Sequence, residues 1–239
     1  MRQKLSIVAL IVVIASMGCG GTSQPTPTIP SAPAEEPAGT KGDATTSPES
    51  AAIAENESFS DEKLFLTFPA ELGQLKFGGY ESFEEPGMGY SIRYSNSDNM
   101  KVDIYVYDKG LLSIVDGTTD PAVAKELASS NSTIRFFEEQ GKYLDVKNLG
   151  EGVYPDESES DSVKYLFSRF QYRQTVRPGV TFAGQRISET YIRGFRDHFV
   201  KVRVSYPESS EKQSIEEREI LLKHLSQSMA AETAKRAPQ

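Results

Sequence analysis

The sequence predicts an α+β fold: a single domain in which a mainly antiparallel, twisted sheet of about six or more strands has two helices packed against it. Two observations support this class. Several runs alternate between apolar and polar residues with the period of two that marks a half-buried strand, and short turn signals join them in meander order. One helical segment interrupts the series and a second follows it. The folded part is expected to span residues 58–230, the size of one domain.

The first group of strands precedes the internal helix. They are expected at residues 64–68, at 75–77 and 80–83 as a hairpin around Gly78-Gly79, at 89–95, and at 100–108. The last two runs alternate most regularly. In residues 89–95 the aromatic and aliphatic side chains of Tyr90, Ile92 and Tyr94 share one face, and we expect that face to be buried.

The internal helix begins at Asp120-Pro121, because Asp is a favoured N-cap and Pro fits the first helical position. It ends near Gly141. Its buried stripe is Val123, Leu127, Ile134 and Phe137, and a break within 129–133 stays open. A short strand at 146–149, a turn at 150–152 and an acidic loop at 155–162 are expected next.

Three long strands and a helix complete the domain. The strands are expected at 163–174, 180–193 and 198–206, with turns at Pro178-Gly179 and at 194–197. Ser209 or Ser210 caps the final helix, and Ser210 with Gln213 fits a capping box. The core stripe of that helix is Ile215, Leu222, Leu225 and Met229, and residues 231–239 are expected to form a frayed tail.

The N-terminus indicates a signal peptide over residues 1–18. Arg2 and Lys4 precede an apolar run of about 11 residues, which is too short to span a bilayer and is typical of a secretory segment. The run closes at Ser16-Met17-Gly18-Cys19 and resembles the lipobox of bacterial lipoproteins. It departs from the usual pattern at Ser16 and Met17. The resemblance implies that Cys19 becomes the first mature residue and carries acyl groups. Ordinary secretion and an uncleaved anchor are the alternatives.

A lipid-anchored chain would hold its domain outside the cytoplasm, in the cell envelope. Gly20 follows Cys19 where Asp would favour retention at the inner membrane, so the periplasmic face of the outer membrane is favoured by analogy. The inner membrane and the cell surface stay open. Residues 19–57 are rich in Pro, Thr, Ser and Ala and are expected to be a disordered tether, with a root-mean-square reach of ~30–35 Å.

Composition restricts the chemistry. The chain has 26 basic and 34 acidic residues, a net charge of −8. Removal of residues 1–18 takes away Arg2 and Lys4, which leaves 24 against 34, or −10. Such a chain is a poor candidate for binding nucleic acid. Cys19 is the single cysteine, so no intramolecular disulfide forms. The two histidines, His198 and His224, lie on different elements, and we expect no metal and no cofactor.

A candidate binding surface is formed by five basic residues of the three long strands: Arg169, Arg173, Arg193, Lys201 and Arg203. If they share one face, they form an anion-binding or partner-binding surface. The alternative is the polar face of a half-buried sheet, held by cross-strand pairs with residues such as Glu189.

Three stretches carry a further resemblance: Phe68-Pro69 with Leu72-Gly73, Tyr105 to Asp108, and Phe199 to Arg203. Together they resemble an uncharacterised family of bacterial envelope proteins, and the order of elements resembles that of PsbP/Mog1-like domains. The resemblance implies class and compartment only. Our first hypothesis is a membrane-tethered, non-catalytic domain that binds a protein or an envelope component. A lipid-anchored hydrolase using carboxylates or a Ser, and a purely structural envelope protein, are the alternatives.

Overall fold

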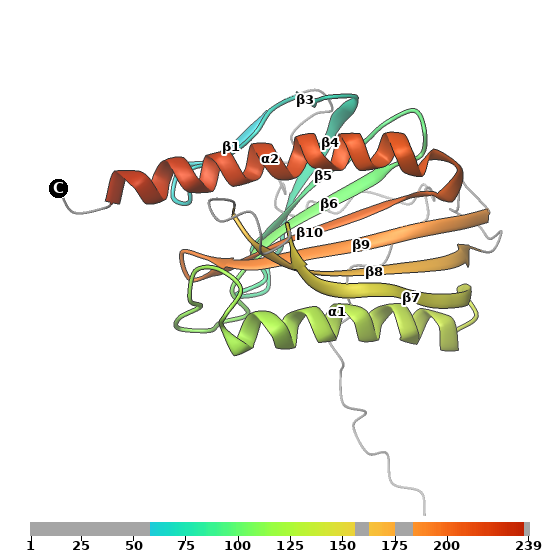
Figure 1. Ribbon diagram of the computed structural model, residues 1–239. Helices are drawn as coiled ribbons and strands as arrows, with labels where there is room; N and C mark the ends of the chain where they lie inside the picture. The colour runs from blue at the N-terminus through green and yellow to red at the C-terminus, as the bar shows by residue number, and fades with distance from the viewer. Residues whose placement is uncertain (1–57, 156–162, 175–183, 237–239) are drawn as a thin grey trace, which may run out of the picture. The chain divides into compact units, whose positions relative to one another are not determined.

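The computed structural model describes residues 58–155, 163–174 and 184–236 (Figure 1). Cys19, the tether at 19–57, the acidic loop from residue 156 onward and the turn at Pro178-Gly179 lie outside these residues. Within them, an eight-stranded sheet, a two-stranded sheet and two α-helices make up one α+β domain, which confirms the predicted fold class.

All neighbouring strands of the large sheet are antiparallel, and their order is β3-β4-β5-β6-β10-β9-β8-β7. Two meanders, β3 to β6 and β7 to β10, therefore meet where β6 pairs with β10. The strands are β3 (Glu71–Leu72), β4 (Leu75–Ser82), β5 (Tyr90–Ser95), β6 (Lys101–Tyr107), β7 (Tyr143–Tyr154), β8 (Tyr165–Gln174), β9 (Gly184–Phe195) and β10 (His198–Pro207).

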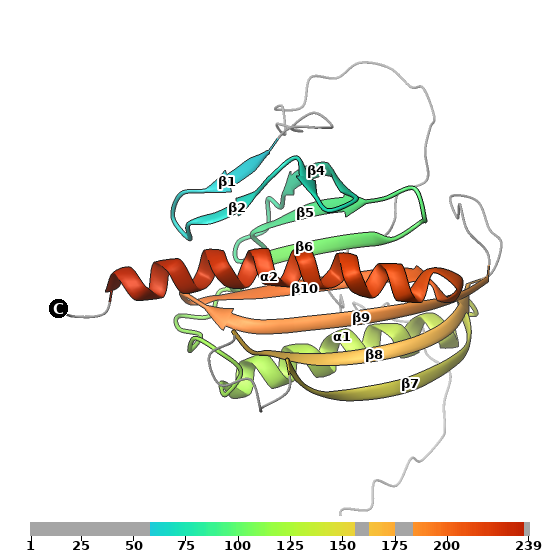
Figure 2. The ribbon, with the colours of Figure 1, turned by 45° about the horizontal axis from the view of Figure 1, so that its top comes forward.

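One side of the sheet is covered by α2 (Glu211–Arg236), which follows a 3-10 turn at Glu208–Ser210. The small sheet of β1 (Phe59–Asp61) and β2 (Leu66–Phe68) lies on the same side (Figure 2). The main core is here. Every second residue of β10, from Val200 to Tyr206, is buried against Leu221, Leu222, Leu225 and Met229 of α2. The predicted alternation of β10 is thus confirmed.

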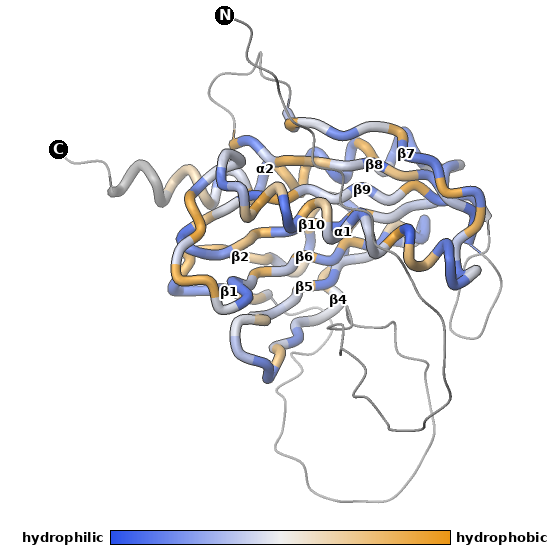
Figure 3. Tube along the Cα trace, turned by 90° about the horizontal axis from the view of Figure 1, so that it is seen from below, coloured by the Kyte–Doolittle hydropathy of each residue, from blue (hydrophilic) through white to orange (hydrophobic). Residues whose placement is uncertain are grey.

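The other side is covered by α1 (Pro121–Glu139). The Asp120 side chain accepts a hydrogen bond from Ala122 N as N-cap, and the helix runs without a break through 129–133. α1 packs on β7, β8 and β9, and its Val123 and Leu127 meet Ile192 of β9 and Phe199 of β10. Figure 3 views the sheet from this side, with β4 and β7 towards its two opposite edges.

Two glycine pairs were wrongly predicted as turns. Gly78-Gly79 lies inside the continuous strand β4, where the register with β5 shifts between Phe77 and Gly79 as a bulge. Gly150 and Gly152 lie inside β7, a twelve-residue strand with two register shifts. In both cases glycine permits an irregular strand rather than a reversal of the chain, and sequence does not separate the two roles.

The start and end of the domain also differ from prediction. Residues 59–61 form a strand, and the run predicted as one strand at 64–68 opens with turn residues, so that β2 begins at Leu66. The capping box is absent, because the Ser210 hydroxyl donates to Pro207 O and Gln213 contacts Gln74. Helix α2 continues to Arg236, past the predicted start of the frayed tail, through good helix formers. No helix within the described residues is long and apolar enough to cross a membrane.

Candidate functional site

The five predicted basic residues do not share a face, so that part of the prediction is wrong. The pairing of the strands determines which side of the sheet each of the five residues faces. Arg193 lies opposite Val200, and Arg169 lies opposite Glu189, so Arg169, Arg173 and Arg193 face the α2 side. Lys201 and Arg203 lie on the α1 side, because Val200 and Val202 point to the core under α2. The sheet therefore carries two separate sets of cations.

The cations on the α2 side make contacts within the domain. Glu189 is 1% exposed and receives hydrogen bonds from the Tyr191 and Tyr206 hydroxyls and from Arg218 Nη1 at 3.0–3.1 Å from the two carboxylate oxygens. Arg169 Nε lies 3.3 Å from the same carboxylate, and its Nη2 pairs with Glu211. Here the predicted alternative, a cross-strand Arg–Glu pair, is what forms.

The remaining two residues of this set are also engaged. The Arg173 guanidinium pairs with Asp145 of the neighbouring strand β7 at 3.0 Å, with both side chains about half exposed. Arg193 lies over the Tyr165 ring and donates to Lys164 O. Burial lowers the pKa of Arg193 below its ordinary value, with Tyr165 and Asp116 opposing the shift. These contacts hold strands and loops together and leave little for a ligand.

The set on the α1 side belongs to a surface that neither of the two described helices covers, although Lys201 lies at its border with α1. We define the open face as the α1-side residues of β4, β5, β6 and β10. Its charged members are the five cations Lys76, Arg93, Lys101, Lys201 and Arg203 and the two carboxylates Glu81 and Asp103. Glu126 of α1 and Lys109 border it and cancel each other, whereas Glu71 of β3, opposite Lys76, lowers the excess of positive charge from three to two. The sign is opposite to the net charge of the chain.

Lys201 is the centre of the border between the open face and α1. Its Nζ lies 3.5 Å from Glu126 Oε1 and 5.0 Å from the ring centroids of both Tyr105 and Tyr107. The Tyr107 hydroxyl donates to the same Glu126 oxygen at 2.5 Å, and Lys109 pairs with the other. Burial lowers the pKa of Lys201, and the charge of Glu126 opposes this shift.

Burial alone would raise the pKa of Glu126. Hydrogen bonds from Lys109 and Tyr107 and the charge of Lys201 outweigh it, so the pKa of Glu126 falls below its ordinary value. Glu126 is thus an ionised carboxylate, only 6% exposed, that ties α1 to the sheet. It also holds the Tyr107 hydroxyl and the Lys201 ammonium group, and Lys201 in turn lies over the Tyr105 ring.

Farther along β10, Arg203 lies opposite Asp103 of β6, which lies opposite Arg93 of β5. A cation, a carboxylate and a second cation therefore occupy one line across three strands. Arg203 Nη2 donates to the Tyr143 hydroxyl at 3.3 Å, and the Tyr143 ring stacks on Tyr172 at 3.9 Å. Burial raises the pKa of Tyr143 to about 12, so its hydroxyl stays protonated at neutral pH.

The sequence predicted Lys201 and Arg203 as candidate site residues, but it did not single out the charged residues that lie around them. Arg93 and Asp103 lie on strands whose alternation was correctly predicted, so their side of the sheet could be read from the sequence. Their proximity to β10 could not, because it depends on the pairing of β6 with β10. The burial of Glu126 could not be predicted, because a Glu in an amphipathic helix is ordinarily exposed.

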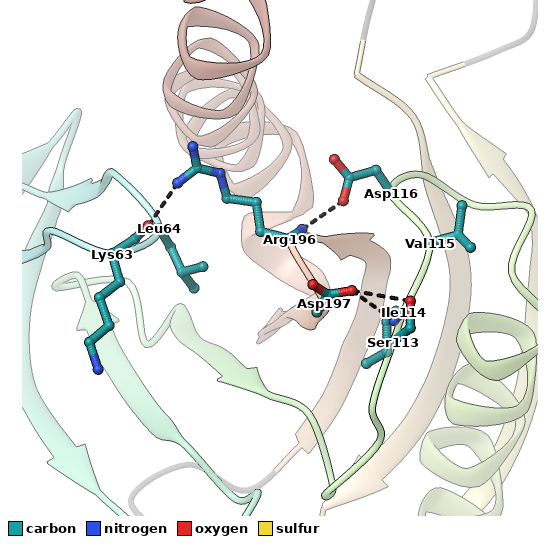
Figure 4. Close-up of a pocket in the computed structure, with 8 residues that line it drawn as sticks. All are labelled: Lys63, Leu64, Ser113, Ile114, Val115, Asp116, Arg196 and Asp197. Carbon is teal, nitrogen blue, oxygen red and sulfur yellow. Dashed lines mark hydrogen bonds between the residues drawn. The ribbon is translucent and has the colours of Figure 1, made fainter. Parts of the chain in front are cut away.

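A separate pocket of about 450 Å³ lies at one end of the sheet, beside the turn between β9 and β10 (Figure 4). Arg196 lies between Lys63 of the β1–β2 turn and Asp116 of the loop before α1: its Nη1 donates to Lys63 O at 2.7 Å, and its backbone N donates to Asp116 at 2.6 Å. Asp197 accepts from the Ser113 hydroxyl and Ile114 N. The polar groups of this pocket thus join three loops.

Both histidines bond main-chain carbonyls. His198 Nδ1 lies 2.7 Å from Arg196 O, and His224 Nε2 lies 2.9 Å from Thr67 O. In the part of the chain that the structure describes, neither ring has a hydrogen bond to a serine hydroxyl. The same residues contain no group of three or more His, Cys, Asp or Glu side chains placed to hold a metal ion.

Among known proteins, the chain resembles a solved structure but no family model. No family model matches the chain, and no curated protein matches it. The solution structure of the cyanobacterial PsbP protein (CyanoP) from Synechocystis sp. PCC 6803 is similar, with a TM-score of 0.40 and 11% sequence identity, over 78% of this chain and 96% of that one. This neighbour is a PsbP protein, and the order of elements predicted from the sequence resembled that of PsbP/Mog1-like domains. A TM-score of 0.40 nevertheless carries no argument about this chain.

Proposed function

We propose that the chain is a lipid-anchored, non-catalytic domain of the cell envelope that binds an acidic segment of a partner through its open face. Cys19 would carry the anchor, residues 19–57 the tether, and residues 58–230 the binding domain. The periplasmic face of the outer membrane is the location we favour. The observation that carries the proposal is the uncovered half of the sheet, where cations exceed carboxylates on an otherwise acidic chain.

The side chains of the open face are suited to recognising carboxylates. Lys76 and Arg93 are exposed, and Arg93 lies opposite Gly79, which has no side chain to cover its guanidinium. Lys201 and Arg203 are held in fixed positions by tyrosines. Fixed cations lose little conformational freedom on binding, and their charge draws an acidic partner in. An extended acidic segment lying across β4 and β5 would meet the exposed Lys76 and Arg93 directly, while Lys201 and Arg203, which are bonded to Glu126 and Tyr143, would add to the positive field beside it.

A polyanion of known chemistry tests the charge of this face. At low ionic strength the full chain is expected to be retained by immobilised poly-L-glutamate despite its net negative charge. The Lys76→Glu/Arg93→Glu variant should weaken this binding about tenfold or more. The matched control is Lys212→Glu/Lys223→Glu, which changes the net charge equally at exposed positions of α2. Equal weakening in both variants, or no retention of the unaltered chain, would contradict the proposal.

Intact mass of the membrane-extracted protein tests the anchor. A chain that begins at Cys19 and carries acyl groups is expected, and Cys19→Ala should be released from the membrane fraction or left unprocessed. A soluble, unacylated chain cut at another bond would refute lipidation. That result would leave the open face to be tested on its own.

A further inference from the structure

Four large apolar side chains are exposed together at one end of the sheet. Phe65 in the β1–β2 turn is 48% exposed, and Leu111, Leu112 and Val115 in the loop before α1 are 44%, 101% and 59% exposed. We call these four residues the apolar tip. Among the described residues they are four of the seven exposed large hydrophobic side chains, the others being Phe136, Leu149 and Ile220.

The two loops of the apolar tip lie at the same end of the sheet, on either side of the β9–β10 turn. Figures 1 and 2 both show the β1–β2 turn and the loop before α1 at the end of the sheet where β9 turns into β10. Residues of both loops line the pocket of Figure 4, and the Arg196 guanidinium lies 4.8 Å from the centre of the Phe65 ring. The apolar tip therefore consists of two exposed apolar loops at one end of the sheet, joined through Arg196.

Hydrogen bonds hold the β1–β2 turn in this position. Asp61 Oδ1 accepts from the backbone N–H groups of Lys63 and Leu64, each at 2.9 Å, and Arg196 donates to Lys63 O. Phe65 has a φ of 59°, a left-handed conformation that a bulky residue rarely adopts. The turn therefore directs the Phe65 ring outward instead of letting it join the adjacent core.

The loop before α1 is held in the same way. Asp197 accepts from Ile114 N, Asp120 accepts from Val115 N, and Gly117 and Gly194 exchange two backbone hydrogen bonds at 2.8–2.9 Å. Asp108 accepts from Gly110 N just before Leu111. A loop fixed at these points presents Leu112 wholly to solvent, which is unfavourable for an aliphatic side chain without a partner surface.

We infer that the apolar tip inserts into the interfacial region of the lipid bilayer to which the chain is anchored. This rests on the proposed lipid anchor. Residue 58 ends the predicted tether, and β1 carries the chain directly from Phe59 towards Phe65, about 10 Å along three strand residues. The tether's predicted reach of ~30–35 Å allows the apolar tip to contact the same membrane.

A bilayer fits the shape and chemistry of this surface better than a protein partner does. Two short loops present separated side chains that project outward, and apolar groups of this kind enter the boundary between headgroups and acyl chains. Lys63 is exposed at the same turn, where a lipid phosphate would meet it. Glu62 is exposed beside Lys63, and the aspartates that accept hydrogen bonds from the loops keep their charge, so the four apolar side chains have to supply the attraction to the bilayer.

The single cysteine of the chain makes a direct test simple. In the acylated protein the Cys19 thiol is consumed, so Leu112→Cys offers one thiol for a polarity-sensitive fluorophore. The labelled protein is reconstituted in vesicles of phosphatidylethanolamine and phosphatidylglycerol that contain spin-labelled lipid. Phe136→Cys on α1, 50% exposed, is the matched control. We expect a blue shift and strong quenching of the label at position 112, and neither at position 136.

A second measurement separates this inference from the anchor. The unacylated Cys19→Ser chain, unlabelled, is titrated with the same vesicles, and Leu112→Asp should weaken its binding about tenfold. Because Leu112 is fully exposed, this change leaves the fold intact. Loss of acylation with quenching at position 112 retained would refute the anchor alone. Acylation without quenching at 112, or a protein crosslink there in place of quenching, would overturn the inference.

Discussion

The buried carboxylate of Glu189 offers the sharpest test of what fixes α2 on the sheet. Its two oxygens receive hydrogen bonds from Tyr191, Tyr206 and Arg218, and Arg169 lies 3.3 Å away. Arg218 comes from α2, and its side chain is 10% exposed. Glu189→Ala would leave a nearly buried guanidinium without this partner and remove the acceptor of two tyrosine hydroxyls.

The expected loss can be worked out from these contacts. Removal of one partner from a buried ion pair costs about 3–5 kcal/mol, because the other charge stays desolvated. Arg218 keeps its contact with Glu219 at 2.5 Å, which partly compensates for the loss. We therefore expect Glu189→Ala to lower the free energy of unfolding by about 4 kcal/mol. For a domain of this size that corresponds to a fall of roughly 8–16 °C in melting temperature.

Urea and thermal unfolding of the full chain would measure this loss, with unchanged slope in urea as the check on two-state behaviour. The control is Asp145→Asn, which breaks the exposed pair with Arg173 and should cost about 1 kcal/mol or less. A cycle of Glu189→Gln, Arg218→Met and the double variant should show coupling of about 0.5–3 kcal/mol. If Glu189→Ala and Asp145→Asn proved equally mild, the buried network would not be what fixes α2.

Three further changes test other parts of the molecule. Leu225→Ala removes a fully buried side chain of α2 and should cost about 2–5 kcal/mol in urea unfolding, whereas a loss below about 1 kcal/mol would show that α2 is loosely packed. Gly194→Ala would drive a new Cβ into Val115 O, costing about 1–3 kcal/mol, and hydrogen exchange should show a loosened loop before α1. Because the folded-state pKa of Glu126 lies below its ordinary value, its ionisation stabilises the fold above about pH 4.5, and this contribution is lost as the pH falls through the folded-state pKa. Glu126→Gln should therefore flatten the decline of stability measured between pH 5 and pH 3, and an unchanged decline would exclude this role.

Local patterns predicted the faces of single strands correctly. The side-chain period of two is a property of one strand, so the buried sides of β5, β6 and β10 followed from their own residues. The relation between strands depends on loop length and pairing. The two-residue turn at Arg196-Asp197 pairs Phe195 with His198, so an odd-numbered residue of β9 shares its face with an even-numbered residue of β10. For this reason Arg193 and Lys201 point to opposite sides.

The open face needed information that sequence patterns do not contain. Its existence depends on the pairing of β6 with β10, which joins two meanders separated by α1. It also depends on α1 packing mainly over β7, β8 and β9, so that α1 reaches β10 and β6 only at Phe199, Lys201 and Tyr107 among the described residues. The apolar tip was missed for a different reason: isolated apolar residues in loops are common, and these four gain meaning only because folding brings the two loops to one end of the sheet.

Burial rather than charge decides which cations of the sheet can recognise a partner. Arg169 and Arg218 are committed to Glu189 beneath α2, whereas Arg93 is exposed on the open face. If the apolar tip rests in the bilayer, the strands rise from the membrane, because the tip lies where β9 turns into β10. Arg203 is five residues along β10 from His198, roughly 17 Å at ~3.4 Å per residue, so Arg203 and Arg93, which is level with it, would stand about that far from the lipid surface. A partner that binds there must carry its acidic segment at that height, which favours a protein that is itself bound to the same membrane.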